Sequence, residues 1–181
     1  MIAPLAPYAM RGVIWYQGES NAGQPEEYLE SMENLIGTWR EAWDQGAFPF
    51  LYVQLAGFRA WGNGWPFLRE AQMQALEIPK TAMAVAIDIG ELTNIHPKNK
   101  QEAGRRLALA ARAIAYGEEI TYSGPLYRES EKEGDRLRLS FDYVDGGLVT
   151  CNGMELRGFT ICGSNKEFQP AKAKIEKGTV V

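Results

Sequence analysis

Three short, uninterrupted apolar runs constrain the fold of this chain more than any other feature. They are GVIWYQ at 12–17, FPFLYVQLAG at 48–57 and TAMAVAI at 81–87. A strand that is buried on both faces is apolar along its whole length, whereas a strand with one solvated face alternates apolar and polar residues. The three runs therefore predict strands of a parallel sheet, with helices covering both of its faces.

A helix is predicted after each apolar run. Residues 25–46 repeat apolar side chains every three or four positions, with Pro25 suited to the first turn and Gly46 placed after the end. A loop rich in glycine and tryptophan leads to a second helix around 67–77, and a third helix runs from about 99 to 116. We therefore expect residues 1–117 to form an α/β domain.

The pattern changes from about Glu118. Residues 135–150 alternate apolar and polar side chains, and the segments that follow are divided by glycine and proline. This is typical of antiparallel strands, so a β-rich segment is expected at 118–181. Cys151 and Cys162 lie eleven residues apart in it. That spacing permits a cross-strand disulfide, and two half-buried thiols are the alternative.

Charge and composition argue against several partners. Lys and Arg number 19 and Asp and Glu number 23, so the net charge is −4 and the basic excess typical of nucleic-acid binding is missing. No apolar run approaches the roughly 18 residues of a membrane-spanning helix. Two cysteines do not make a zinc site, which usually takes four ligands. We expect no nucleic acid, no membrane and no metal.

Polar residues follow the first apolar run, in the sequence QGESN at 17–21. Sheets of this class carry their sites just beyond the carboxyl ends of the strands. The amides of Gln17 and Asn21, together with N–H groups of the turn, can be aimed at developing negative charge, as an oxyanion hole requires. The alternative is a polar turn that caps the next helix through Ser20 or Asn21.

His96 is the only histidine of the chain, and it lies after the third apolar run and just before the third helix. Pro97 restricts the backbone next to it. An imidazole is the usual general base for a hydroxyl nucleophile, and at this edge of the sheet it would face the same crevice as residues 17–21. The alternative is a histidine at a helix entry that makes a structural hydrogen bond.

Two long motifs carry a resemblance to a known family. RGVIWYQGESNA at 11–22 and IHPKNKQEAGRRLALAARAIAYG at 95–117 resemble the sialate O-acetylesterase family, whose members are SGNH-type serine esterases. The resemblance extends over about residues 1–175. It implies a flavodoxin-like α/β core, no cofactor, and hydrolysis of an acetyl ester on a sugar such as O-acetyl sialic acid. It also suggests a secreted or periplasmic location in bacteria.

The resemblance assigns roles to individual residues. His96 matches the family's catalytic base. The QGESN turn matches a block that helps to build the oxyanion hole, in which we favour the Gln17 amide with the Gly18 N–H beside it. Asn21 is the second choice for the amide donor. Glu19 is expected to be a structural residue that fixes the turn.

The chain also departs from the family pattern. The family's nucleophile is a serine in a GQSN-like block after its first strand, and nothing here matches that block. We therefore expect a truncated domain that is nearly inactive alone and exposes an apolar sheet edge, which self-associates or binds a complementary N-terminal segment. Ser20 is a weaker candidate nucleophile. The acid partner of His96 stays open between Asp88, Glu91 and a backbone carbonyl.

A loop with Arg59, Trp61 and Trp65 follows the second apolar run. Tryptophan faces can stack on sugar rings and arginine can pair with a sugar carboxylate, so these residues are candidates for substrate binding. The alternative is that both tryptophans pack the loop onto the core. Two other functions stay open: a non-catalytic carbohydrate-binding or scaffold domain, and an SGNH esterase acting on a non-sugar ester.

Overall fold

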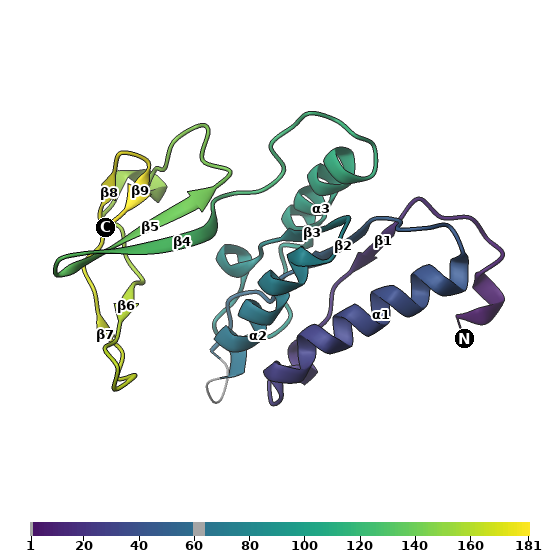
Figure 1. Cartoon of the computed structure of the whole chain (residues 1–181), viewed down its shortest axis with the longest axis horizontal. Helices are drawn as coiled ribbons and strands as arrows, with labels where there is room; N and C mark the ends of the chain where they lie inside the picture. Colours follow the sequence, from purple (N-terminus) through teal and green to yellow (C-terminus); the bar gives the residue numbers. More distant parts are fainter. Residues whose placement is uncertain (1, 60–63) are drawn as a thin grey trace. The chain divides into compact units, whose positions relative to one another are not determined.

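The computed structural model describes residues 2–59 and 64–181, which fall into two compact units, Met1–Ser123 and Gly124–Val181 (Figure 1). The first unit holds a parallel sheet in the order β1-β2-β3. Its strands are β1 (Val13–Trp15), β2 (Phe50–Val53) and β3 (Thr81–Ala84), and its helices are α1 (Tyr28–Trp43), α2 (Gly64–Gln74) and α3 (Lys100–Ile114). Short 3-10 turns lie at Ala3–Leu5, Glu19–Asn21, Pro25–Glu27, Ala75–Glu77 and Ile87–Ile89.

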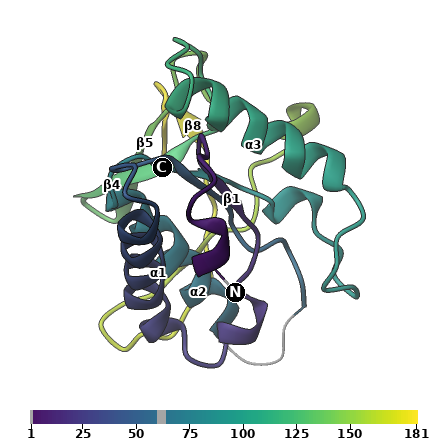
Figure 2. The same ribbon diagram turned by 90° about the vertical axis from the view of Figure 1, so that its right-hand side faces the viewer.

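Helices cover both faces of this sheet, as the apolar runs predict. On one face, Phe50 packs against Trp39 of α1, and the Tyr52 hydroxyl donates a hydrogen bond to the carbonyl of Gln72 in α2. On the other face, Leu51 and Val53 lie in clusters with side chains of α3. Successive side chains of a strand point to opposite faces, so the wholly buried β2 has one helix layer on each side (Figure 2).

The third strand is shorter than predicted. It ends at Ala84, and the expected residues 85–87 leave the sheet and enter the 3-10 turn at Ile87–Ile89. The carbonyl of Val85 accepts a hydrogen bond from Arg106 of α3 at 2.6 Å. An arginine of the covering helix therefore donates a hydrogen bond to the backbone just after the strand ends.

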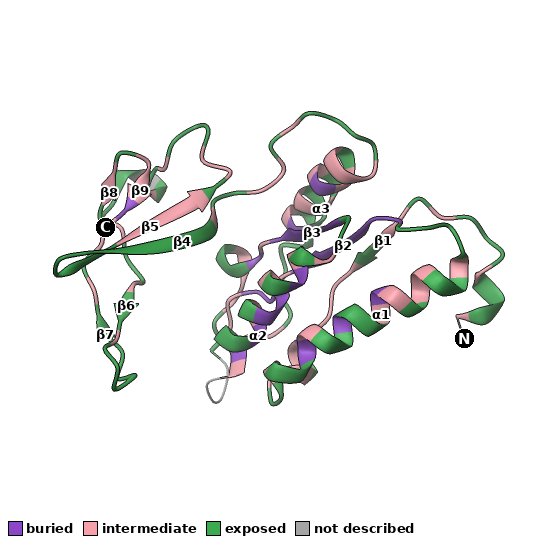
Figure 3. Cartoon of the chain, in the orientation of Figure 1, coloured by how far each residue is buried: buried purple, intermediate pink, exposed green. Residues whose placement is uncertain are grey.

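The second unit is antiparallel. Its main sheet has the order β4-β5-β9-β8, and β6 pairs with β7. The strands are β4 (Leu126–Glu133), β5 (Arg136–Asp142), β6 (Thr160–Ile161), β7 (Gln169–Pro170), β8 (Ile175–Glu176) and β9 (Thr179–Val180), with a 3-10 turn at Cys151–Gly153. Among the described residues of this unit only Val180 is buried (Figure 3). Both cysteines are free thiols in this structure.

No helix in the described part of the chain has both the length and the apolar character needed to cross a bilayer.

Candidate functional site

The QGESN loop leaves the carboxyl end of β1 through a glycine. Gly18 is buried and has φ of 151°, a conformation that side chains with a Cβ rarely adopt. A Cβ built there would lie 3.2 Å from Gln72 Nε2, 3.2 Å from Leu68 and 3.3 Å from Leu55. The loop therefore rests directly on α2 and on the segment after β2, and glycine is the residue that permits this contact.

The polar groups of Gln17 are held on two sides. Its carbonyl accepts hydrogen bonds from the Tyr28 hydroxyl at 3.1 Å and from Gln72 Nε2 at 3.3 Å. Its side-chain amide donates to Asn21 Oδ1 at 2.7 Å. A primary amide nitrogen carries two N–H groups, so one remains for another acceptor. The structure thus brings together the two amides that the sequence singled out.

The segment after β2 connects the loops that follow β1 and β3. On one side, the N–H of Leu55 donates to Gln72 Oε1 at 2.9 Å, and Gln72 in turn bonds the Gln17 carbonyl. On the other side, the N–H of Arg59 donates to the carbonyl of Leu92 at 3.0 Å. All three strand exits are therefore tied together at one edge of the sheet.

His96 is exposed in the loop after β3, and Pro97 beside it is buried. The backbone around it is braced: the His96 N–H donates to Asn94 Oδ1 at 2.9 Å, and the Lys98 N–H donates to Glu91 Oε1 at 3.0 Å. No hydrogen bond to the imidazole is found among the residues that the structure describes. The ring is therefore accessible on a backbone that is fixed on both sides.

The two carboxylates considered as acid partners of His96 have other partners. Asp88 forms a two-pronged ion pair with Arg106, at 2.6 and 2.7 Å. The hydrogen bond from Arg106 lowers the pKa of Asp88. Glu91 accepts the Lys98 N–H and lies 3.7 Å from its ammonium group. Within the described part of the chain, neither carboxylate forms a hydrogen bond with the imidazole. Of the three candidate partners of His96, only a backbone carbonyl is not already engaged by another residue in this way.

The start of α3 contacts the end of β1. The Lys100 ammonium lies 4.4 Å from the centroid of the Tyr16 ring, a cation–π contact. Tyr16 directly precedes Gln17, and Lys100 follows His96 by four residues. This contact joins the segments that carry the two sequence motifs.

The predicted sugar-binding loop is only partly described. Trp61 lies outside the described residues. Trp65 is 6% exposed, its indole N–H donates to the Ala56 carbonyl at 3.0 Å, and its ring packs against Phe58. This burial favours the packing alternative for Trp65, because a stacking platform needs an exposed ring face. Arg59 is exposed and stays a candidate for substrate binding.

For two other residues of the first loop, Ser20 and Glu19, the structure provides fewer contacts that bear on a role. Ser20 is exposed in the 3-10 turn at Glu19–Asn21. No hydrogen bond to the Glu19 carboxylate is found within the described ranges, so its structural role stays a prediction. After burial, the negative charge of Glu19 is the second cause that raises the pKa of Tyr16.

Sequence reasoning missed Gln72 and Tyr28, the two side chains that hold the Gln17 carbonyl. A signal for Gln72 was present. It occupies the apolar stripe of its helix with Leu68, Ala71 and Ala75, and it is 0% exposed. A polar residue on a buried stripe needs partners for its hydrogen-bonding groups, and here those partners lie in the site.

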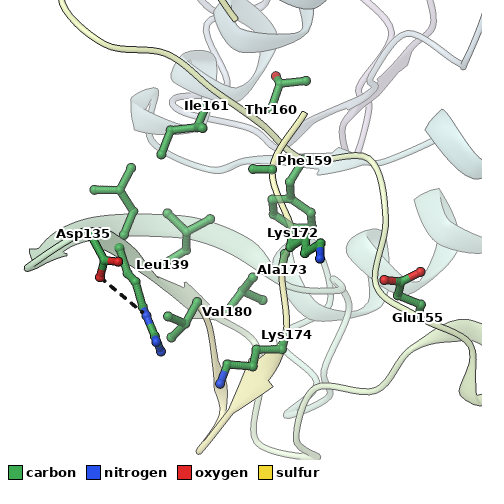
Figure 4. Close-up of a pocket in the computed structure, with 14 residues that line it drawn as sticks. Asp135, Leu139, Glu155, Phe159, Thr160, Ile161, Lys172, Ala173, Lys174 and Val180 are labelled. Carbon is green, nitrogen blue, oxygen red and sulfur yellow. Dashed lines mark ion pairs between the residues drawn. The ribbon is translucent and has the colours of Figure 1, made fainter. Parts of the chain in front are cut away.

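The second unit contains a hollow of about 720 Å³. Figure 4 shows Leu139 and Val180 on one side of it and Phe159 and Ala173 on the other. Charged residues also line it, including Lys172 and Lys174. None of the residues singled out from the sequence lines this hollow.

Comparisons with known proteins identify the family of this chain. A family model described as a carbohydrate esterase, sialic acid-specific acetylesterase, matches residues 3–113. The chain is 37% identical over 166 residues to the sialate O-acetylesterase of Mus musculus, covering 78% of this chain and 31% of that protein. It is 36% identical over 188 residues to the Homo sapiens sialate O-acetylesterase, covering 92% of this chain and 36% of that protein.

A solved structure is also similar. The crystal structure of a carbohydrate acetylesterase from Xanthomonas citri matches with a TM-score of 0.94 and 43% sequence identity, covering 98% of this chain and 42% of that one. The family model and the matched proteins place the chain among the carbohydrate esterase families. More narrowly, the chain belongs to the sialic acid-specific acetylesterase family. It spans about a third of the length of the curated relatives it matches.

Proposed function

We propose that this chain supplies the base and part of the oxyanion hole of an SGNH-type carbohydrate O-acetylesterase with a flavodoxin-like core. The substrate is an acetylated sugar such as O-acetyl sialic acid. The observation that carries the proposal is the joining of the three strand exits, because it gathers the QGESN loop and the braced His96 loop at one edge of the sheet. The nucleophilic serine comes from a segment outside these 181 residues.

The reaction follows the serine-esterase scheme. His96 takes the proton of the serine hydroxyl as the oxygen attacks the acetyl carbonyl, and then gives that proton to the departing sugar oxygen. The free N–H of the Gln17 amide and the N–H of Gly18 donate to the negative oxygen of the tetrahedral intermediate. Water, deprotonated by His96, then releases acetate from the serine. Arg59, which is exposed, pairs with a carboxylate of the sugar.

A first experiment measures nitrophenol release from nitrophenyl acetate by the chain alone. We expect almost none, because no block of this sequence matches the one that carries the family's nucleophilic serine. Turnover by the chain alone that disappears in His96→Ala would instead place the nucleophile within these residues, and Ser20→Ala would be the next variant to measure.

A second experiment supplies the missing portion. In a chimera, residues 1–181 replace the matching stretch of the Xanthomonas citri acetylesterase, which is similar over 98% of this chain. We expect deacetylation of O-acetyl sialic acid, with His96→Ala lowering kcat by about 10²–10⁴-fold, the usual contribution of a general base. Lys98→Ala, at a side chain 83% exposed, is the matched control and should stay active. A folded chimera that keeps full activity without His96 rules out its role as base.

A further inference from the structure

The carbonyl of Gln17 is the most heavily restrained group of the candidate site. It accepts from the hydroxyl of Tyr28, whose side chain is 2% exposed, and from the amide of Gln72, which is 0% exposed. Burial raises the pKa of Tyr28, so the hydroxyl keeps its proton and remains a donor at neutral pH. Two buried donors on one carbonyl fix the direction in which that carbonyl points.

A peptide group transmits this restraint to the next residue. The bond between Gln17 and Gly18 is trans, and in a trans peptide the N–H points opposite to the carbonyl. Pinning the Gln17 carbonyl toward Tyr28 and Gln72 therefore turns the Gly18 N–H away from them. That N–H is donated in none of the hydrogen bonds found across residues 2–59 and 64–181, so it has no acceptor among them.

The hydrogen bonds of Gln72 leave one orientation of its carboxamide. Oε1 faces the Leu55 N–H at 2.9 Å, and Nε2 faces two carbonyl oxygens, those of Gln17 at 3.3 Å and Val53 at 3.4 Å. Exchanging oxygen and nitrogen would set donor against donor and acceptor against acceptors. The Gln72 side chain of α2 thus fixes the position of the first loop relative to the residues at the end of β2.

We propose that Gln72 and Tyr28 are positioning residues of the esterase: they orient the Gln17–Gly18 peptide so that the Gly18 N–H serves the oxyanion hole. The catalytic part of this proposal, the use of the Gly18 N–H in the oxyanion hole, rests on the proposed function. The orientation itself can be tested on the 181-residue chain without any activity.

The test is an NMR correlation between the amide of Gly18 and the carbonyl carbon of Gln17 in the labelled chain. That single peak reports the peptide in question. In Gln72→Met and in Tyr28→Phe the carbonyl loses a donor, so its carbon resonance should move upfield, while the peaks of β3 stay in place. Gln72→Met also removes the partner of the Val53 carbonyl and of the Leu55 N–H, so the peaks of these two residues should move in that variant and not in Tyr28→Phe. Tyr28→Phe removes one oxygen atom and keeps the ring, which preserves packing. A peak that does not move in either variant overturns the proposal.

Gln72→Glu adds a pH profile that a merely structural role would not give. A protonated carboxyl at this position can still donate to Gln17, whereas a carboxylate cannot. Burial opposite two carbonyl oxygens should raise its pKa above the ordinary Glu value of about 4.3. The Gln17 carbonyl resonance should therefore move upfield as pH rises through that raised pKa. Gln74→Glu, on an exposed face of the same helix, is the control and should leave the peak unmoved.

Kinetics of the chimera separate this proposal from the proposed function. Gln72→Met should lower kcat with little change in KM, by up to the about 10²–10³-fold that loss of one oxyanion-hole donor costs. Unchanged kcat in a chimera that His96→Ala inactivates overturns the positioning role. If His96→Ala leaves the chimera active while the Gln17 resonance still moves in the variants of the chain, the proposed function fails and the peptide orientation stands.

Discussion

Gly18 combines a positive φ with close contacts around its Cα, so it tests the packing of the first loop. In Gly18→Ala, the new methyl group would meet Gln72 Nε2 at 3.2 Å in a backbone conformation unfavourable for alanine. We expect the free energy of unfolding to fall by about 1–3 kcal/mol. The five tryptophans of the chain all precede Ser123. Urea unfolding followed by tryptophan fluorescence therefore reports the first unit.

The control for this substitution is Gly23→Ala. Gly23 follows the same loop and has no atom within 4 Å of a built Cβ. Its unfolding midpoint should stay near that of the parent chain. Equal losses in the two variants would mean that the contact of Gly18 with α2 does not constrain the loop.

Some residues of the candidate site could be recognised from the sequence, and others only from the structure. Gln17 and Gly18 could be singled out from the sequence because they lie where an apolar run gives way to polar residues. His96 could be singled out because it is the only histidine of the chain and lies just before the third helix. For Gln72 the sequence contained only the anomaly of a polar residue on an apolar helix stripe, and for Tyr28 it contained no signal, because the partner of each side chain is a backbone carbonyl that any residue could supply. Trp65 shows the opposite case: its aromatic type suggested sugar stacking, but only the packing shows that its indole is buried against Phe58.

At the level of elements, Asp88 and Arg106 join the exit of β3 to α3. Because Arg106 lowers the pKa of Asp88 in the folded chain, the pair stabilises the fold above the unfolded pKa of about 3.9 and stops doing so as pH falls through the lower, folded value. The Asp88 side chain is 56% exposed, so we expect only about 0.2–1 kcal/mol. Asp88→Asn should lose that much at pH 7.

The measurement compares urea midpoints of the parent chain and Asp88→Asn at pH 7 and at pH 2.5. The difference between them should shrink at the lower pH, because pH 2.5 lies below the unfolded pKa of about 3.9, where the contribution of the pair declines toward the lowered folded pKa. Asp135→Asn, at a side chain 95% exposed in the second unit, is a control that should leave the tryptophan transition unchanged at both pH values. A difference that grows on acidification would contradict this account.

The sequence predicted whether a segment forms a helix or a strand more readily than it predicted the residues at which that element begins and ends. The apolar runs marked the strands of the sheet because those strands are buried on both faces. β4 has no such mark, since only Leu126 among its eight residues is even half-buried. Its strand pairing with β5 is backbone hydrogen bonding, which leaves little trace in the choice of side chains. The early end of β3 coincides with a hydrogen bond from a distant residue, Arg106, to the Val85 carbonyl, and local sequence does not show such a contact.

For the whole first unit, β1 forms one border of the sheet, and β2 is its only strand neighbour among the described residues. Ile14 of β1 is 70% exposed, although its register partner Leu51 on β2 is 3% exposed. α3 packs on β2 and β3, where it covers Leu51. An apolar strand with an open edge and an uncovered side chain is suited to pairing with another strand.

We therefore expect the chain alone to self-associate, and Ile14→Lys to weaken that association. Burying most of an isoleucine side chain contributes on the order of 1.5 kcal/mol, so the dissociation constant should rise roughly tenfold. Sedimentation velocity over a range of concentrations measures this. Leu92→Lys is matched to it, because Leu92 is also 70% exposed but lies in the loop after β3. A chain that stays monomeric at high concentration, or equal effects of the two variants, would exclude β1 as the associating edge.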